Sequence, residues 1–224
     1  MNYQGVFFDF DYTLGDSTGP ITVGYQNGFE AMGWPCPTRE QVRPTIGMTL
    51  MDGYTMLTGD GDPDRRQEFY RQFQLAVGEA AGEGHQRIMV EGTELFPGAG
   101  ELLDWLKGRG VQVAIVSTKL GQTIRRIFAH QGLADRIDLI LGGKDVSRAK
   151  PDPEGLNLAM ERLGLAREQV LFCGDTVIDA GAARNAGVDF CAVLNGTTTA
   201  EAFEPYPHVH IAPDLLELRR WLER

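Results

Sequence analysis

The chain has 224 residues, enough for one large domain or a domain with an insertion, and it can bury a substantial core without disulfides. Its formal net charge of -10 and pI near 4.9 argue against partners such as nucleic acid or an anionic membrane, which need clustered lysine and arginine. Three widely separated cysteines, with no visible export signal or membrane span, favour a cytoplasmic protein with reduced thiols.

A buried strand is predicted near the N-terminus, where the apolar run GVFF is followed by Asp9 and Asp11. Residues two apart in a strand point to the same side, so we expect the two carboxylates to lie close together. Such a pair costs free energy unless a positive charge lies between its members. The two aspartates are therefore the first candidates for a functional site.

Residues 16–92 are predicted to form a helical insertion. Within them, RRQEFYRQFQLAVGEA spaces three apolar residues four apart, as on one helix face: Phe69, Phe73 and Val77. No convincing strand is visible in this part of the sequence. The passage EGTELFPGAG returns the chain to the main domain, which we expect to comprise residues 1–15 and 93–224.

From about Pro97 onward, short apolar runs alternate with helical patterns. Four runs are predicted to be buried strands: 111–117, 137–143, 169–175 and 188–195. Each is preceded or followed by a stretch with helical spacing, and glycines follow the ends of these helices. This alternation predicts an α/β fold with a Rossmann-like parallel sheet, in which the N-terminal run is the first strand.

Polar residues follow several of the predicted strands. The second ends in Ser117, with Thr118 and Lys119 next, and Lys150 lies in the loop after the third. The fourth ends in Asp175, and Asp179 follows four residues later. Singly, each has an ordinary explanation: a helix cap, a surface lysine or an acidic first turn of a helix. In a parallel sheet, however, ligands bind beyond the carboxyl ends of the strands, where these residues would meet.

Taken together, the aspartates predict a metal site. Four converging carboxylates would have to protonate unless a cation joined them: Asp9, Asp11, Asp175 and Asp179. Mg2+ suits a site with few carboxylates, water and phosphate oxygens. Ser117, Lys150 and nearby main-chain amides can hold the other oxygens of an anion. The predicted ligand is thus a small phosphorylated molecule.

These stretches resemble the haloacid dehalogenase-like hydrolase superfamily over nearly the whole chain. DFDYTLGDS is similar to the first motif of that superfamily, VSTK to the second, Lys150 in KPDPE to the third and GDTVIDA to the fourth. An insertion directly after the first motif resembles the helical cap of the phosphatase and phosphomutase branch. The sequences of the motifs VSTK and KPDPE are most similar to those of phosphoglycolate phosphatases and their pyrophosphatase relatives.

The resemblance implies roles for the matching residues. Asp9 would be a nucleophile that forms an aspartyl-phosphate, and Asp11 would be the general acid and base. The Asp9 carboxylate, the main-chain carbonyl of Asp11 and Asp175 would bind Mg2+, with Asp179 in support. Ser117 and Lys150 would hold the transferring phosphoryl group, and Lys150 is counted with the catalytic residues. Ser117, Thr118 and Lys119 are the candidates for substrate binding in the main domain.

The implied activity is hydrolysis of a small phosphomonoester, such as phosphoglycolate or a related compound. A sugar phosphomutase similar to beta-phosphoglucomutase, or an inorganic pyrophosphatase, would have nearly the same site. A signalling receiver also uses clustered acids, Mg2+ and a lysine, but it would be about half as long and would lack the insertion. A silent phosphoryl-binding relative would usually lack one motif acid or the lysine, and none is missing here.

The insertion is expected to close over the site and contact the leaving group. Candidates for this contact include Arg43, Thr45 and Met48, of which Arg43 is counted as a substrate-binding residue. Each could equally be a helix-surface or packing residue. The motifs leave the physiological phosphate ester and the oligomeric state open.

Overall fold

The computed structural model describes residues 3–77 and 86–224, and the chain divides into two compact units. The first, here called the core unit, consists of Met1–Gly15 and Leu95–Arg224. The second, the inserted unit, consists of Asp16–Glu94. The short strands β2 (Gly15–Asp16) and β3 (Glu94–Leu95) form a two-stranded sheet where the chain passes from one unit to the other.

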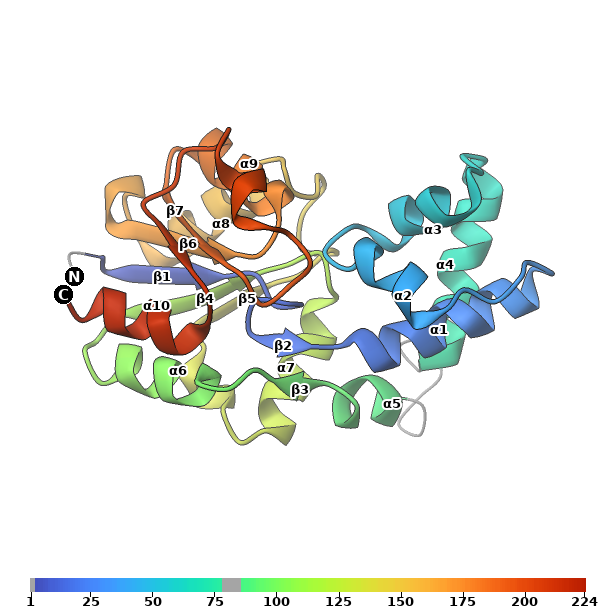
Figure 1. Cartoon of the computed structure of the whole chain (residues 1–224). Helices are drawn as coiled ribbons and strands as arrows, with labels where there is room; N and C mark the ends of the chain where they lie inside the picture. The colour runs from blue at the N-terminus through green and yellow to red at the C-terminus, as the bar shows by residue number, and fades with distance from the viewer. Residues whose placement is uncertain (1–2, 78–85) are drawn as a thin grey trace. The chain divides into compact units, whose positions relative to one another are not determined.

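The core unit is built on a six-stranded parallel sheet with the strand order β5-β4-β1-β6-β7-β8 (Figure 1). Its strands are β1 (Gly5–Phe8), β4 (Gln112–Val116), β5 (Leu139–Leu141), β6 (Val170–Gly174), β7 (Asp189–Val193) and β8 (His210–Ala212). The central strand β1 is fully buried and pairs on both sides, with Phe8 opposite Ile115 of β4 and Cys173 of β6. The carboxyl ends of β1, β4 and β6 therefore lie side by side.

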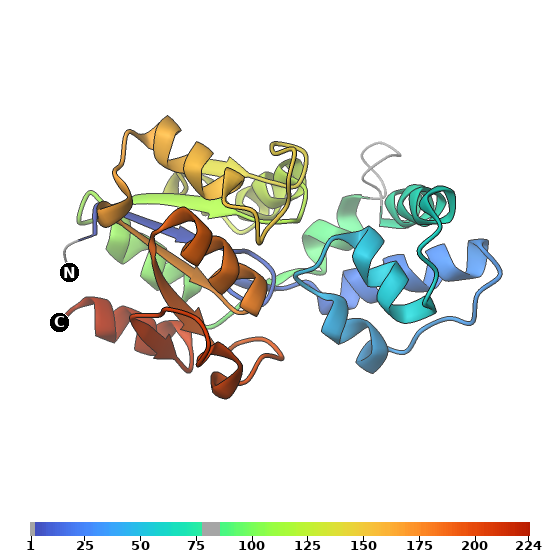
Figure 2. The same cartoon turned by 90° about the horizontal axis from the view of Figure 1, so that it is seen from above.

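Helices cover both faces of this sheet (Figure 2). One face is covered by α8 (Glu154–Leu163) and α9 (Val177–Ala186), and the other by α6 (Ala99–Lys107), α7 (Gly121–His130) and α10 (Leu215–Leu222). Short 3-10 helices complete the unit: η2 (Ala134–Arg136), η3 (Arg167–Gln169) and η4 (Ala200–Phe203). Buried Phe7, Phe172 and Phe190 fill the layer below α8 and α9. This is the predicted α/β Rossmann-like fold.

The five predicted strands are confirmed, but β8 and α10 were not predicted. β8 has only three residues at the edge of the sheet, too few for a clear apolar run. The start of α10 is marked by Asp214, whose side chain accepts a hydrogen bond from Glu217 N over 2.7 Å. Gly164 and Gly187 follow α8 and α9 in left-handed backbone conformations, with φ of 67° and 72°, as predicted for C-terminal caps.

The inserted unit is helical in its described residues, apart from the two short strands at its ends. Its helices are α1 (Thr18–Ala31), α2 (Arg39–Val42), η1 (Arg43–Thr45), α3 (Leu50–Thr58), α4 (Pro63–Val77) and α5 (Gln86–Glu91). The predicted helix is confirmed as α4, although residues 78–80 of that prediction lie outside the described residues. The boundaries 16–92 and the role of a cap stay predictions.

Aromatic side chains form the interior of the inserted unit. Five rings contact one another, with centroids 5.1 to 6.1 Å apart: Tyr25, Phe29, Tyr54, Phe69 and Phe73. A Cβ added at Gly28 of α1 would lie 2.9 Å from the Phe69 ring, so α1 and α4 pack closely there.

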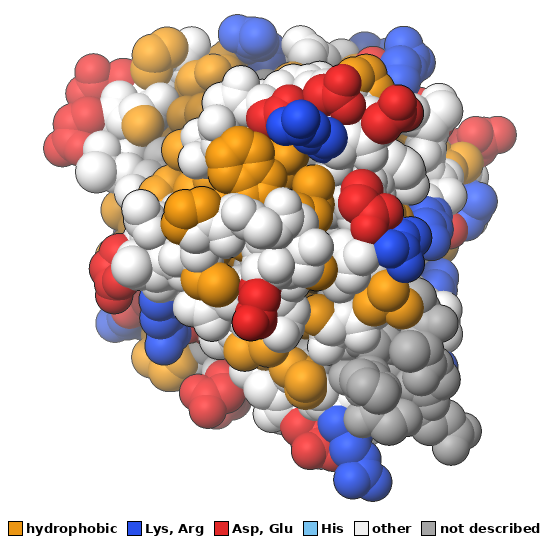
Figure 3. Space-filling model, turned by 90° about the vertical axis from the view of Figure 1, so that its right-hand side faces the viewer, with side chains coloured by type: hydrophobic (Ala, Val, Ile, Leu, Met, Phe, Trp, Pro, Cys, Tyr) orange, Lys and Arg blue, Asp and Glu red, His pale blue; other side chains and the backbone are white. Residues whose placement is uncertain are grey.

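On the face of the molecule shown in Figure 3, acidic and basic side chains lie near one another among hydrophobic ones.

Among the described residues, no helix has the length and apolar character needed to cross a membrane.

Candidate active site

Asp9 continues the pairing of β1 with β6, whereas Asp11 lies in the turn that follows. Asp9 N donates to Cys173 O over 2.9 Å, so the pairing with β6 continues one residue past the strand. The chain then turns: Phe10 O accepts hydrogen bonds from the amides of residues 13, 14 and 15, and Tyr12 has a left-handed φ of 59°. The extended strand on which the same-side expectation relied therefore does not continue to Asp11.

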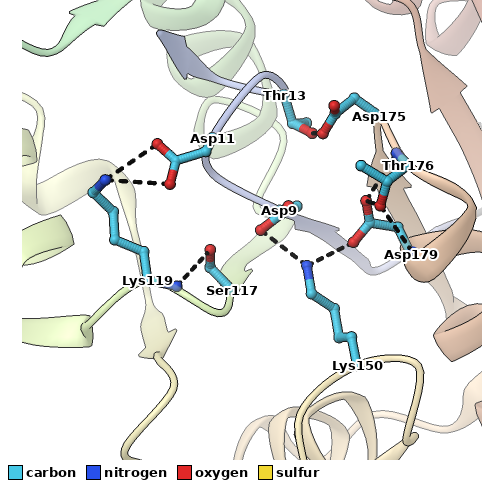
Figure 4. A network of polar contacts seen from close by, with 9 residues as sticks. All are labelled: Asp9, Asp11, Thr13, Ser117, Lys119, Lys150, Asp175, Thr176 and Asp179. Carbon is cyan, nitrogen blue, oxygen red and sulfur yellow. Dashed lines mark hydrogen bonds and ion pairs between the residues drawn. The ribbon is translucent and has the colours of Figure 1, made fainter. Parts of the chain in front are cut away.

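A buried ion-pair cluster lies at the end of β1 (Figure 4). Lys150 Nζ is 2.9 Å from Asp9 Oδ1 and 2.6 Å from Asp179 Oδ1, and none of the three side chains is more than 5% exposed. Burial alone would lower the pKa of Lys150, but the attraction of Asp179 and Asp9 outweighs burial and raises it. Lys150 therefore remains an ammonium between two carboxylates.

Three carboxylates at this position can together bind a cation. Among the described residues, Asp9, Asp175 and Asp179 each offer an oxygen, and these oxygens lie within 4.8 Å of one another. Burial raises the pKa of Asp9 to about 6, and burial followed by the charges of Asp179 and Asp9 raises that of Asp175 well above its ordinary value. Lys150 and a hydrogen bond from Ser117 oppose the rise at Asp9.

The donor set fits a divalent cation. Asp9 Oδ1 is buried and, despite its ion pair with Lys150, has no partner aligned as a hydrogen bond. Three carboxylates against one ammonium leave an excess of two negative charges, which a hard cation with oxygen ligands would neutralise. The predicted convergence holds for three aspartate side chains, and the carboxylate of Asp11 is not part of this group.

Asp11 is paired with Lys119 instead. Lys119 Nζ lies 3.2 Å from each carboxylate oxygen of Asp11, and both side chains are almost completely buried. Lys119 follows β4, so this ion pair joins the loops after two neighbouring strands (Figure 4). Sequence reasoning placed Lys119 among the substrate contacts and did not foresee this pairing.

Two threonines orient the aspartates that follow β6. The hydroxyl of Thr13 donates to Asp175 Oδ1 over 3.1 Å. Thr176 donates to Asp179 Oδ2 from its hydroxyl over 2.6 Å and from its main-chain amide over 3.0 Å. Thr176 is also the N-cap of α9, in a reciprocal capping box with Asp179. The pattern T-x-x-D before the helix could have identified this residue, which sequence reasoning missed.

The loop after β4 places a hydroxyl beside Asp9. Ser117 N donates to Leu141 O of β5 over 3.0 Å, which fixes the residue, and its hydroxyl oxygen accepts from Lys119 N over 3.3 Å. Ser117, Thr118 and Lys150 line one small cavity of the core unit. Six predicted residues of the core unit lie with Asp9 at this edge of the sheet: Asp11, Ser117, Lys119, Lys150, Asp175 and Asp179. Among them, Asp11 and Lys119 contact each other rather than the group of three carboxylates.

The candidate residues of the insertion lie in the inserted unit. Arg43 begins η1 and is exposed, and its contact with a substrate remains a prediction. Thr45 is buried, and its hydroxyl donates a hydrogen bond to Val42 O over 2.8 Å. This contact stabilises the local backbone, and a contact of Thr45 with substrate stays a prediction. Met48 is partly exposed, and its role also remains a prediction.

Several known proteins are similar to this chain in sequence and fold. Residues 6–193 match the model of the family described as haloacid dehalogenase-like hydrolase. Pyrophosphatase PpaX of Bacillus velezensis is 31% identical over 95% of this chain and 94% of its own. Phosphoglycolate phosphatase 1 of Pseudomonas aeruginosa is 32% identical over 85% of this chain and 69% of its own. A crystal structure of a haloacid dehalogenase-like hydrolase from Bacteroides fragilis matches with a TM-score of 0.89 and 38% identity, over 96% of this chain and 99% of that one.

Proposed function

The chain belongs to the haloacid dehalogenase-like hydrolase family and is a hydrolase of the phosphatase type, and on this premise we propose that it is a Mg2+-dependent phosphatase for a small phosphomonoester. One observation carries the proposal. Asp9 is a buried carboxylate that faces an ammonium and two further carboxylates at the carboxyl end of the central strand. With a divalent cation bound, that combination could attract a phosphoryl group and supply a nucleophile to it.

In the proposed reaction, a carboxylate oxygen of Asp9 attacks phosphorus, and the bond from phosphorus to the leaving oxygen breaks. Asp11, which must start in its protonated form rather than as the carboxylate paired with Lys119, gives its proton to that oxygen, so the product alcohol leaves neutral. Asp11 then takes a proton from water, which attacks the aspartyl-phosphate. The bond from phosphorus to Asp9 breaks, inorganic phosphate leaves and both aspartates return to their starting states.

The Lys150 ammonium and the hydrogen bond from Ser117 favour the ionised form of Asp9 that this attack requires, against burial and the charge of Asp179. Mg2+, when bound, would offset the carboxylate excess and polarise the phosphoryl oxygens. We assign its binding to Asp9, Asp175 and the main-chain oxygen of Asp11, with Asp179 in support. Lys150 and Ser117 would hold the transferring phosphoryl group, because both already lie beside the Asp9 carboxylate. Thr118 and Lys119 would complete that loop, with Lys119 orienting Asp11.

The proposed substrate is a small phosphorylated metabolite related to phosphoglycolate. Support comes from relatives named phosphoglycolate phosphatase, and the full-length match to a protein named pyrophosphatase makes inorganic pyrophosphate the second candidate. A phosphomutase activity would require a substrate hydroxyl in place of water. We further propose that residues 16–92 act as a cap carrying Arg43, and that the protein, whose three cysteines are unpaired, works in the cytoplasm.

A phosphate-release screen tests the proposal. The purified chain would be offered phosphoglycolate, other small phosphate esters, sugar phosphates, nucleotides and pyrophosphate, with Mg2+ and with EDTA. We expect Mg2+-dependent release of phosphate from at least one small phosphate compound. Release that continues unchanged after thorough chelation, or that persists in a folded Asp9→Asn variant, would contradict the assigned mechanism. Conversion of one sugar phosphate into its isomer without phosphate release would identify a mutase.

A further inference from the structure

The loop after β7 is a part of the core unit that none of the sequence motifs includes. β7 ends at Val193, at the same edge of the sheet as the ends of β1 and β6. Leu194 N donates to Ala212 O over 2.9 Å, so pairing with β8 continues one residue past the strand. Asn195 and Gly196 therefore leave the sheet from a fixed backbone position.

Asn195 supports the loop that carries Asp11 and Thr13. Its side-chain amide donates to the main-chain oxygen of Thr13 over 3.1 Å. The hydroxyl of the same threonine donates to Asp175 Oδ1 over 3.1 Å. Thr13 is fully buried and Asp175 is 2% exposed, so water cannot easily replace the bond between them, whereas Asn195 is partly exposed. Asn195 thus holds Thr13 in place, and Thr13 in turn holds one carboxylate oxygen of Asp175.

Gly196 lies against the other oxygen of Asp175. A Cβ added at Gly196 would collide with Asp175 Oδ2 and would lie 3.1 Å from the Cβ of Tyr12. Only glycine lets the chain pass this close without moving the carboxylate or the loop after β1. Both oxygens of Asp175 are therefore constrained, directly or through Thr13, by two consecutive residues of one loop.

From these contacts we infer that Asn195 and Gly196 are positioning residues that hold the Asp175 carboxylate in its metal-binding orientation. The inference rests on the proposed function, in which Asp175 is a ligand of Mg2+. Groups that orient a ligating side chain matter nearly as much as the ligand itself, and their loss typically weakens metal affinity or activity by about 10- to 100-fold.

Mg2+ binding to the full-length protein, measured by calorimetry, tests this role. Asn195→Ala and Gly196→Ala should each raise the Kd for Mg2+ by about 10-fold or more, and turnover should recover toward the wild-type rate at saturating Mg2+. Asn195→Leu, which keeps a similar shape but has no donor, should behave like Asn195→Ala. Its result decides the question if the alanine variant does not fold.

Two matched variants serve as controls. Asn157→Ala removes an exposed side-chain amide from α8. Gly100→Ala adds a Cβ to α6 that would meet only Leu133 Cδ1, at an ordinary 3.7 Å. Both should bind Mg2+ as the wild type does. A wild-type Kd in Asn195→Leu and Gly196→Ala, even with a lowered melting temperature, would overturn the inference, because the loop would then serve only the fold.

Asp175→Asn separates this inference from the proposed function. If Asp175→Asn loses Mg2+ binding while the loop variants keep it, the positioning role alone is wrong. If Asp175→Asn binds Mg2+ with the wild-type Kd, the metal assignment in the proposed function is itself wrong.

Discussion

Both units of the chain have exposed ion pairs, but among the described residues only the core unit has buried ones. In the core unit, Asp9, Lys150 and Asp179 form ion pairs in a nearly complete absence of solvent. In the inserted unit, the side chains of the pair Arg71–Glu68 are 57% and 42% exposed. Its interior consists instead of aromatic rings, which need no compensating charge.

This difference indicates where the chemistry lies. Burying a charge costs several kcal/mol unless a partner compensates it, so a fold gains little stability from a buried cluster of acids and lysines. Such clusters are typical of functional sites, where perturbed pKa values are useful. Exposed ion pairs such as Arg71–Glu68 contribute only about 0 to 1 kcal/mol and say little about function. The buried cluster therefore supports the proposed catalysis in the core unit, and substrate selection by the inserted unit stays a prediction.

Replacing the proposed nucleophile, Asp9, should have the largest effect. Asp9→Asn is nearly isosteric, but its amide cannot attack phosphorus, so we expect turnover to fall by at least about a thousandfold. Phosphate release from the best substrate in the screen measures the loss, and circular dichroism verifies the fold. Substantial activity in the folded variant would remove catalysis from the core-unit cluster and so break the comparison.

Removing the buried ammonium should rank second. Lys150→Ala leaves two buried carboxylates without their partner, a loss that typically costs about 3 to 5 kcal/mol of stability. We expect a lower melting temperature and a similar fall in turnover for every phosphate ester, since Lys150 is assigned to the phosphoryl group they share. A fall confined to one substrate would instead place Lys150 at the leaving group.

A variant of the inserted unit should have a selective effect. Arg43→Ala should lower kcat/KM for an anionic natural substrate by about 10- to 100-fold, equal to about 1.5 to 3 kcal/mol for one lost charge-assisted contact. Turnover of a generic aryl phosphate should hardly change. Arg71→Ala, in the same unit, is the matched surface control. Equal losses on both substrates would indicate a role for Arg43 in the chemistry or in folding.

The smallest expected effect is a change with pH in how much Mg2+ raises the melting temperature. The folded pKa of Asp9 is about 6, above its ordinary value of 3.8, so protonation of Asp9 stabilises the metal-free protein at low pH. That contribution is lost as the pH rises through about 6. Since Mg2+ competes with the proton, it should raise the melting temperature more at pH 7.5 than at pH 5, by a few degrees. Thermal unfolding with and without Mg2+ measures this, and an equal Mg2+ effect at both pH values would show that Asp9 is not involved.

The sequence predicted the sheet better than it predicted the loops. Runs such as VQVAIVS are buried on both faces, so their composition alone identifies the strands and hence the edge where the motifs meet. The chain turns after Asp9, with Phe10 O accepting hydrogen bonds from the amides of residues 13 to 15, and no apolar pattern encodes that turn. The Lys119–Asp11 pair and the Asn195 contact join loops far apart in the sequence, so spacing along the chain could not reveal them.

Asp179 links the start of a helix to the charge of the site. One of its oxygens closes the first turn of α9 with Thr176, and the other holds Lys150. Fraying of that turn would remove a partner of Lys150, and displacement of Lys150 would weaken the capping box. The first turn of α9 and the loop before α8 should therefore open together as one cooperative unit, with matching rates of amide hydrogen exchange. Folding of this helix and assembly of the site are, in that sense, a single event.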